Sequence, residues 1–574
     1  MSSSSQVNLL DDDYRKFAQS VVADWNGHSA VVGLLKIADD PANNQIEFVT
    51  VGHADEDTLF CIASNTKIIT AAALDQLVRQ GKVNWTDKVR DLYPGIDLQD
   101  DFADQRATLQ DVLAHHSGIP RHEKSYRWGD TPAQLVSRLK HLKPSADFRA
   151  NWQYNNLWYI SAAHLVSQIS GQPFTEYVKE NFFKPLGMTS STFTPLLDSD
   201  KSRKRMATGY VTLPDSTTIE APFIFDRTKD ELEFNAGAGG ISSSAKDQLV
   251  WAEVMIRQYR RAFKKDKTEH NSFDNVLRPE GIKQLSAGRS LTFRHAPHEE
   301  EDAGAYGAGL WTFTYQGERY LKHGGGVPGF TSQVLWSPER GIGIVTLFNG
   351  EGNVADILAY RAFEKALGLE KQVDWNARSL KSRDEQMKQW RERKPKPSKG
   401  KPVLPLDAYF GRFDNPGYGS IYVCPARQHR QSYDAPIHAD CEKVYESWDE
   451  SARIVNKPDS GDNELYLVKE TIFSGSHIAI QLTSTTSDDG KEGWDGQWVT
   501  VYPPFQERKD TVVSYNDELV HVEFGMSLEG SRQTVDTIRL WGVWGAGPER
   551  ESVESDLYWK QRKFDDPEVM FSRA

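Results

Sequence analysis

Residues 64–78 read SNTKIITAAALDQLV, and this stretch indicates the fold most directly. Its apolar residues occur on almost every side, a pattern typical of a helix that is buried all round. Ser64 and Lys67 lie three residues apart, on one face of the predicted helix and within a turn of its N-terminus. Burial lowers the pKa of a lysine, so a neutral Lys67 could take a proton from Ser64. The stretch predicts a nucleophile beside its general base, with first-turn amides positioned to stabilise an oxyanion.

The Ser-x-x-Lys spacing is weak on its own, because the chain repeats it at three other places. What distinguishes Ser64 is its context, since the strand-like DTLFCIA precedes it and an apolar helix follows. Cys61, three residues earlier, is an alternative nucleophile. Its place in an apolar strand favours a packed core residue instead. The spacing recurs at Ser137 with Lys140, Ser243 with Lys246, and Ser398 with Lys401.

A second element lies in residues 152–166, WQYNNLWYISAAHLV, where Tyr154 and Asn156 form a Tyr-x-Asn triplet ahead of an apolar helix. A tyrosine near a cation can be drawn toward its phenolate and share the work of a base. An asparagine amide can hold a lysine side chain and a substrate carbonyl at once. The alternative is an aromatic start to a core helix.

A third element is ERYLKHGGG at residues 318–326, a predicted strand that ends in His323 and three glycines. Glycines let a substrate backbone approach closely, and an amide such as that of Gly326 could donate to an oxyanion. Three glycines could equally form only a turn.

The chain has 574 residues, which implies two to four folding units. Lysine and arginine dominate from about residue 371 to 402, where prolines interrupt any helix. We therefore expect a first domain over residues 1–372, a linker over 373–402 and a second domain over 403–574. Short apolar alternations recur after the linker and predict about eight strands in an antiparallel barrel or sandwich.

Helical and extended patterns alternate before the linker, so the first domain is predicted to be mixed α and β. Besides the helix that begins at Ser64, three helices are expected, at residues 11–25, at 157–169 with Gly171 closing it, and at 174–183 ending before Pro185. Strands are expected at residues 30–37, 45–52, 318–326, 331–337 and 341–349.

Composition excludes several classes. The net charge of −13 disfavours nucleic acid as a partner. Three cysteines are too few for a disulfide framework and leave at least one free thiol, which favours a reducing compartment. No secretory leader pattern and no spanning apolar run is present, so we expect a cytoplasmic protein without membrane association. No pattern for a metal or a cofactor is found, and none is expected.

The order Ser-x-x-Lys, Tyr-x-Asn, His-Gly-Gly resembles the family of class C β-lactamases, D-alanyl-D-alanine carboxypeptidases and D-aminopeptidases. Longer stretches are also similar to that family, and the resemblance covers about residues 10–370. It implies an α/β (α+β) serine β-lactamase and transpeptidase-like fold, an antiparallel sheet flanked by helices with a helical subdomain. The similar stretches are LQDVLAHHSGIPR at 109–121, residues 154–193, AGAGGISSSAKDQLVW at 236–251 and GGGVPGF at 324–330.

The resemblance also implies roles for individual residues. Ser64 would be the acylated nucleophile, Lys67 and Tyr154 the general-base system, and Asn156 a polar organiser. The substrate would lie along Gly325, and the amides of Ser64 and Gly326 would hold the oxyanion. His323 replaces the lysine of the family's Lys-Thr-Gly element. A histidine is only partly charged near neutral pH, so efficient β-lactam turnover is in doubt while acyl transfer is not.

The second domain opens with LDAYFGRFDNPGYGSIYV at residues 406–423, which looks like the start of a lipocalin-like barrel found in some family members. Such a barrel could cap the active site, restrict substrate length, build a homo-oligomer or only stabilise the chain.

Three functions follow from these patterns. The first is hydrolysis of an ester, an amide or a D-amino-acid peptide bond in a small molecule or short peptide, through an acyl-enzyme on Ser64. The second is transfer of the same acyl group to another acceptor in a small-molecule pathway. The third is a catalytically idle binding protein, which a retained buried lysine disfavours.

Overall fold

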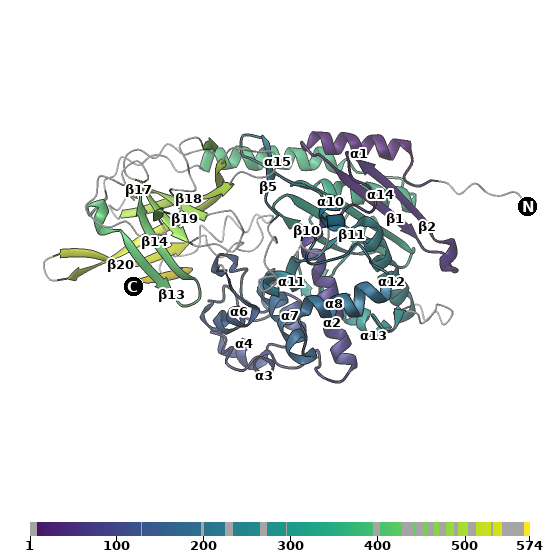
Figure 1. Cartoon of the computed structure of the whole chain (residues 1–574), viewed down its shortest axis with the longest axis horizontal. Coiled ribbons are helices and arrows are strands. Elements are labelled where there is room, and N and C mark those ends of the chain that lie inside the picture. The colour runs from purple at the N-terminus through teal and green to yellow at the C-terminus, as the bar shows by residue number, and fades with distance from the viewer. Residues whose placement is uncertain are drawn as a thin grey trace, which may run out of the picture.

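A computed structural model covers the whole chain, and Figure 1 shows two parts joined along one edge by a long helix. The described residues are 8–127, 129–196, 200–223, 233–263, 273–293, 295–393, 402–426, 441–442, 445, 452–455, 464–469, 478–486, 492–502, 512–529, 532–541 and 567–574.

The first part is built on an eight-stranded sheet in which every neighbouring pair is antiparallel. The first strand of this sheet along the chain, β1, pairs with its last strand, β12, and Ala30 lies opposite Phe348. The strand order is β2-β1-β12-β11-β10-β9-β8-β7. The strands are β1 Ala30–Lys36, β2 Gln45–Val51, β7 Ser290–Leu291, β8 Ala305–Tyr306, β9 Trp311–Tyr315, β10 Glu318–Val327, β11 Phe330–Ser337 and β12 Ile342–Phe348.

Both faces of this sheet are covered by helices, which explains why β1 is apolar at nearly every position. Alternate residues of a strand point to opposite faces. Val31 and Leu35 join the larger core cluster, whereas Val32 and Leu34 join a second cluster on the other face. Helices α1 Asp12–Asp24 and α14 Val354–Leu367 pack on that second face, and α12 Ala245–Phe263 packs on the first.

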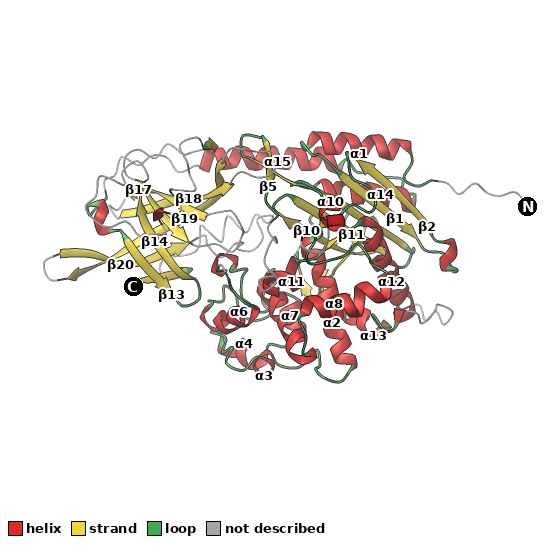
Figure 2. Cartoon of the chain, in the orientation of Figure 1, coloured by secondary structure: helices red, strands yellow, loops and turns green. Residues whose placement is uncertain are grey.

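A helical subdomain surrounds α2 Thr66–Arg79, which is buried along most of its length as its apolar pattern predicts. Helix α7 Asn156–Ser170 packs beside α2 and ends at Gly171, whose φ of 77° permits the left-handed helix cap. Figure 2 shows the helices gathered below the sheet. The others are α3 Val89–Leu92, α4 Asp101–Arg106, α5 Leu109–Leu113, α6 Pro132–Arg138, α11 Glu233–Gly239 and α13 Pro279–Leu285. Helix α10 Asp200–Arg205 lies apart from them, beside residues 57–59, because the Leu59 amide donates to the Arg205 carbonyl.

The helix expected to end before Pro185 continues past it. Helix α8 Phe174–Val178 widens into a π-helical turn, Lys179–Phe183, and α9 Lys184–Leu186 follows. Pro185 sits in the first turn of this last segment, where the missing amide proton costs least. The chain stops at Gly187, which has a φ of 66°.

The linker region is largely helical, because α15 Trp375–Arg393 runs through it, and Trp375 is buried in the second core cluster. The strands that follow form a curled sheet, antiparallel except for the pairing of β15 with β19. Strand β19 pairs with β20 as well as with β18, which connects the two ends of the strand series. The strands are β13 Gly411–Asn415, β14 Gly419–Pro425, β15 Arg453–Val455, β16 Glu464–Lys469, β17 Ile478–Thr486, β18 Glu492–Tyr502, β19 Val512–Glu529, β20 Arg532–Trp541 and β21 Val569–Arg573.

The cysteines are arranged differently from the expectation for a reducing compartment. Cys424 and Cys441 form a disulfide with their Cα atoms 5.9 Å apart, and Cys61 is the free, buried thiol. Disulfides persist mainly in oxidising compartments, so this pair weighs against the compartment that the cysteine count suggested. Among the described helices, none is both long and apolar enough to cross a membrane.

Candidate active site

Ser64 lies on a sharp turn between a strand and a helix, not inside the helix as its sequence suggested. Strand β3 Phe60–Cys61 ends, Ala63 adopts a left-handed φ of 47°, and a 3-10 turn, Ala63–Asn65, leads into α2. This conformation costs a non-glycine residue on the order of 1–3 kcal/mol, so the surroundings must hold it. Asn65 Nδ2 donates to Ser332 Oγ at 2.8 Å, and Ser332 Oγ donates to the carbonyl of Ile62 at 2.8 Å. These bonds tie the turn to β11.

Lys67 lies directly behind the half-buried Ser64. Its Nζ is 3.0 Å from Ser64 Oγ and donates to the carbonyl of Ala238 at 2.6 Å. The side chain is completely buried. Burial, and then the positive charge of Arg121, hold the pKa of Lys67 well below its ordinary value. A neutral amine in this position can keep its N–H on Ala238 and turn its lone pair toward Ser64.

Tyr154 lies on the other side of the nucleophile. Lys67 Nζ is 4.9 Å from the centre of its ring, and the Ser64 side chain is near enough to act on the pKa of its hydroxyl. Burial raises the pKa of Tyr154 above its ordinary value, against the lowering effects of Ser64 and Arg121. The expectation that a nearby cation draws this tyrosine toward its phenolate is therefore wrong, and Tyr154 is a protonated hydroxyl.

Asn156 begins α7, but its amide is held by Glu123 rather than by Lys67. Asn156 Nδ2 donates to Glu123 Oε1, which also accepts from Arg121 Nη2 at 3.0 Å. The Arg121 guanidinium lies 5.0 Å from the centre of the Tyr154 ring. Burial alone would raise the pKa of Glu123, but Arg121 and these hydrogen bonds keep it below its ordinary value. The site thus contains an ion pair.

The Arg121–Glu123 pair was missed at the level of sequence. The only signal was its position, shortly after the HHSG residues 115–118. Each of the two side chains is 33% exposed, so both reach the surface of the site.

His323 lies on β10 and is completely buried. Its Nε2 is 2.9 Å from the hydroxyl of Tyr306, and its Nδ1 is 2.6 Å from the carbonyl of Gly324. Burial, and then the positive charge of Lys67, lower its pKa to about 3. The expectation of a partly charged His323 near neutral pH is wrong, because the ring is neutral. It cannot serve as a cationic clamp for a carboxylate.

The glycines after His323 run beside the turn that carries Ser64. A Cβ atom on Gly325 would lie 2.2 Å from the carbonyl oxygen of Ile62, so only glycine fits there. Gly326 is exposed, with open space where a side chain would be. The strand edge that the sequence suggested for substrate therefore lies against the nucleophile turn.

Aromatic rings and a second neutral histidine surround these groups. His115 packs against Tyr154 with ring centres 4.4 Å apart, and the pKa of His115 is held well below its ordinary value by burial and by Lys67. Trp311, half-buried on β9, stacks parallel to the Tyr154 ring. In the described part of the chain, no cluster of metal-binding side chains occurs. The arrangement offers a hydroxyl, a neutral amine and a phenol within contact of one another.

Comparison with known proteins gives a consistent result. Residues 34–367, more than half of the chain, match the Beta-lactamase family. An unguisins hydrolase of Aspergillus campestris is 29% identical over 397 residues, covering 64% of this chain and 68% of its own length. Protein flp of Staphylococcus aureus is 24% identical and covers 52% of this chain and 54% of its own length.

A solved structure extends the likeness of the fold. The octameric penicillin-binding protein homologue from Pyrococcus abyssi superposes with a TM-score of 0.51 at 18% identity. It covers 88% of this chain and 98% of its own, so the shared fold reaches beyond the residues that match the family. The chain is a member of the Beta-lactamase family of serine hydrolases.

Proposed function

We propose that this enzyme hydrolyses an amide, peptide or ester bond of a small molecule or short peptide through an acyl-enzyme on Ser64. One observation carries the proposal, the 3.0 Å approach of Lys67 Nζ to Ser64 Oγ in surroundings that keep the lysine neutral. A serine hydroxyl is a weak nucleophile until an adjacent base accepts its proton.

Acylation begins when Lys67 accepts the Ser64 proton and Oγ attacks the substrate carbonyl. The backbone amides of Ser64 and Gly326 stabilise the oxyanion that forms. The tetrahedral intermediate then collapses, its bond to the leaving group breaks, and the leaving group takes a proton from Lys67 by way of the Tyr154 hydroxyl. Tyr154 fits this relay because its hydroxyl is protonated and its ring lies beside Lys67, the partner of Ser64.

Deacylation repeats the same chemistry with water as the nucleophile. Lys67, neutral again, removes a proton from water, which attacks the ester carbonyl. The proton returns to Ser64 Oγ as the acid product leaves. Asn156 is fixed by Glu123, and its buried Oδ1 has no hydrogen-bond partner among the described residues.

Hydrolysis is favoured over transfer to another acceptor by the relatives, one of which is named as a hydrolase of unguisins. His323 is neutral and buried. Among the described residues, the half-exposed cation beside Tyr154 is Arg121, which is already paired with Glu123. This pairing disfavours a substrate whose recognition depends on a free carboxylate.

We also propose the division into residues 1–372, 373–402 and 403–574, with a closed, lipocalin-like barrel in the last part. The pairing of β19 with both β18 and β20 supports closure. Assembly into a homo-oligomer is proposed from the likeness to an octameric homologue.

The test is intact-mass spectrometry of wild type and Ser64→Ala after exposure to a fluorophosphonate and to a p-nitrophenyl ester. The proposal predicts one adduct on wild type and none on Ser64→Ala. An adduct that survives in Ser64→Ala, or no adduct on wild type, would contradict it.

A further inference from the structure

The segment 121–127 lies between the catalytic residues and the C-terminal sheet, and it contacts both. On one side, Glu123 holds the amide of Asn156 and Arg121 lies over Tyr154. Between them, His122 adopts a left-handed φ of 49° and directs its side chain the other way. A non-glycine residue keeps such a conformation only when its surroundings fix it.

The contacts from the C-terminal sheet to this segment are polar and specific. The Tyr418 hydroxyl is 2.6 Å from His122 Nδ1, and both side chains are buried. His122 Nε2 is 2.9 Å from the carbonyl of Lys143, so both ring nitrogens are engaged.

Lys469, the last residue of β16, holds the backbone of the same segment. Its Nζ donates to the carbonyls of Lys124 and Tyr126, the latter at 3.1 Å. Nζ also lies 5.6 Å from the centre of the Tyr418 ring. In return, Lys124 Nζ lies 4.1 Å from the ring of Trp498. The segment is therefore fastened by its backbone as well as by its side chains.

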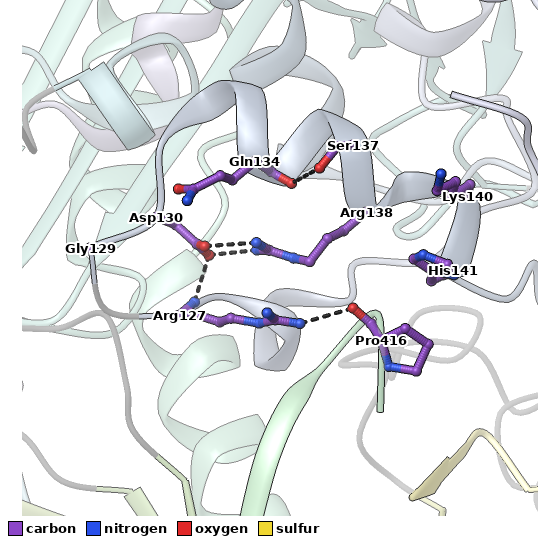
Figure 3. Close-up of a pocket in the computed structure, with 9 residues that line it drawn as sticks. All are labelled: Arg127, Gly129, Asp130, Gln134, Ser137, Arg138, Lys140, His141 and Pro416. Carbon is purple, nitrogen blue, oxygen red and sulfur yellow. Dashed lines mark hydrogen bonds and ion pairs between the residues drawn. The ribbon is translucent and has the colours of Figure 1, made fainter. Parts of the chain in front are cut away.

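The contact continues beyond Tyr126. Figure 3 shows Arg127 reaching toward Pro416, whose carbonyl it meets at 2.9 Å, beside the paired Asp130 and Arg138. These residues line a polar cavity of about 470 Å³ between the two parts. Segment 121–127 thus belongs to a wider contact between the two parts, and it is the stretch of that contact that also touches the catalytic residues.

We infer that the C-terminal sheet positions part of the active site. Tyr418 and Lys469 hold segment 121–127 so that Glu123 binds the Asn156 amide and Arg121 lies over the Tyr154 ring. The inference rests on the proposed function of Ser64. Tyr418 and Lys469 do not touch the reacting atoms. They act through Glu123 and Arg121. A displacement of Glu123 would release the Asn156 amide.

The test uses the full chain and compares Tyr418→Phe and Lys469→Met with Arg453→Met. Arg453 is a matched control, because it also joins the two parts, through Thr217 Oγ1 at 3.2 Å, but does not touch the segment. The readout is the rate at which a fluorophosphonate labels Ser64, with the thermal unfolding of each variant measured in parallel. Having two variants keeps the test decisive if one fails to fold.

We expect Tyr418→Phe and Lys469→Met each to slow labelling by about tenfold, the scale of a small misplacement of catalytic groups. Arg453→Met should change the rate by less than about twofold, as for a surface contact. In a Glu123→Ala background, Tyr418→Phe should cause a smaller further loss than in wild type, because the part of its effect that passes through Glu123 is already gone.

If wild type is labelled and both variants are labelled at the wild-type rate, the inference is overturned and the proposed function stands. An equal loss in the presence and absence of Glu123 would overturn it as well, since that result indicates general destabilisation. Failure to label wild type would overturn the proposed function and the inference with it.

Discussion

Each part of the molecule contains a lysine whose pKa is lowered by removal from water and which donates to backbone carbonyls beside a tyrosine ring. Lys67 lies within the catalytic core, completely buried, and Lys469 lies where the C-terminal sheet meets segment 121–127, partly buried. The pKa of Lys469 is lowered to about 7, first by burial and then by the charges of Arg127 and Arg138. Of these two lysines, Lys67 is the one that lies within hydrogen-bond distance of the Ser64 hydroxyl.

The difference shows that a lowered pKa does not identify a general base. The acceptors of Lys469 are carbonyl oxygens, which carry no proton to give up. Lys67 has the Ser64 hydroxyl at hydrogen-bond distance, so its lone pair can do chemical work. We therefore assign proton transfer to one lysine and positioning to the other.

The largest expected effect separates the two lysines directly. Lys67→Met should lower the rate of Ser64 labelling by about 10³-fold or more, because the base is lost. Lys469→Met should cost only about tenfold. Labelling time courses followed by intact mass measure both, and equal losses would contradict the distinction between them.

The next effect concerns the hydroxyl of Tyr154. Tyr154→Phe keeps the ring that packs on Trp311 and removes the proposed proton relay. We expect kcat for a p-nitrophenyl ester to fall by about 10²-fold. A decrease of less than threefold, with about the same KM, would remove Tyr154 from the mechanism.

The smallest effect is on stability and follows from the sign of the Lys469 shift. Its folded-state pKa, about 7, lies below the ordinary value of 10.5. Between these two pKa values, the unfolded chain binds a proton at Lys469 that the folded chain lacks. The free energy of unfolding therefore increases as pH rises from 7 to 10.5 and decreases as pH falls back toward 7. Lys469→Met should flatten this rise. Thermal unfolding midpoints from pH 6 to 10 measure it, and parallel profiles for the two proteins would contradict it.

The sequence was most informative where a local pattern carries the structure. The all-round apolar pattern after Ser64 predicted a buried helix, and the structure has one, α2, at Thr66–Arg79. The apolar runs at residues 30–37 and 341–349 predicted strands, which the structure pairs as β1 and β12. Their pairing could not be read from either run, because it joins opposite ends of the first part.

Charge state and distant contacts were beyond the local pattern. The sequence next to His323 does not show that its ring nitrogens contact the Tyr306 hydroxyl and the Gly324 carbonyl in a buried site. The neutral charge of the ring therefore followed only from the fold. Glu123 reaches Asn156 across 33 residues, and Lys469 reaches Lys124 across 345. Such contacts are set by tertiary packing, whereas periodicity reports only which face of an element is apolar.

The proposed mechanism requires a Lys67 that is neutral near pH 7, and the pH dependence of Ser64 labelling tests this directly. Fluorophosphonate labelling rates would be measured on wild type and Lys67→Arg from pH 5 to 10. Because the active form is the deprotonated amine, the wild-type rate should rise through one ionisation well below 10.5, the ordinary lysine value, and then level off. Lys67→Arg, which stays charged, should show no such rise. A wild-type rate that is still climbing at pH 10 would contradict the account.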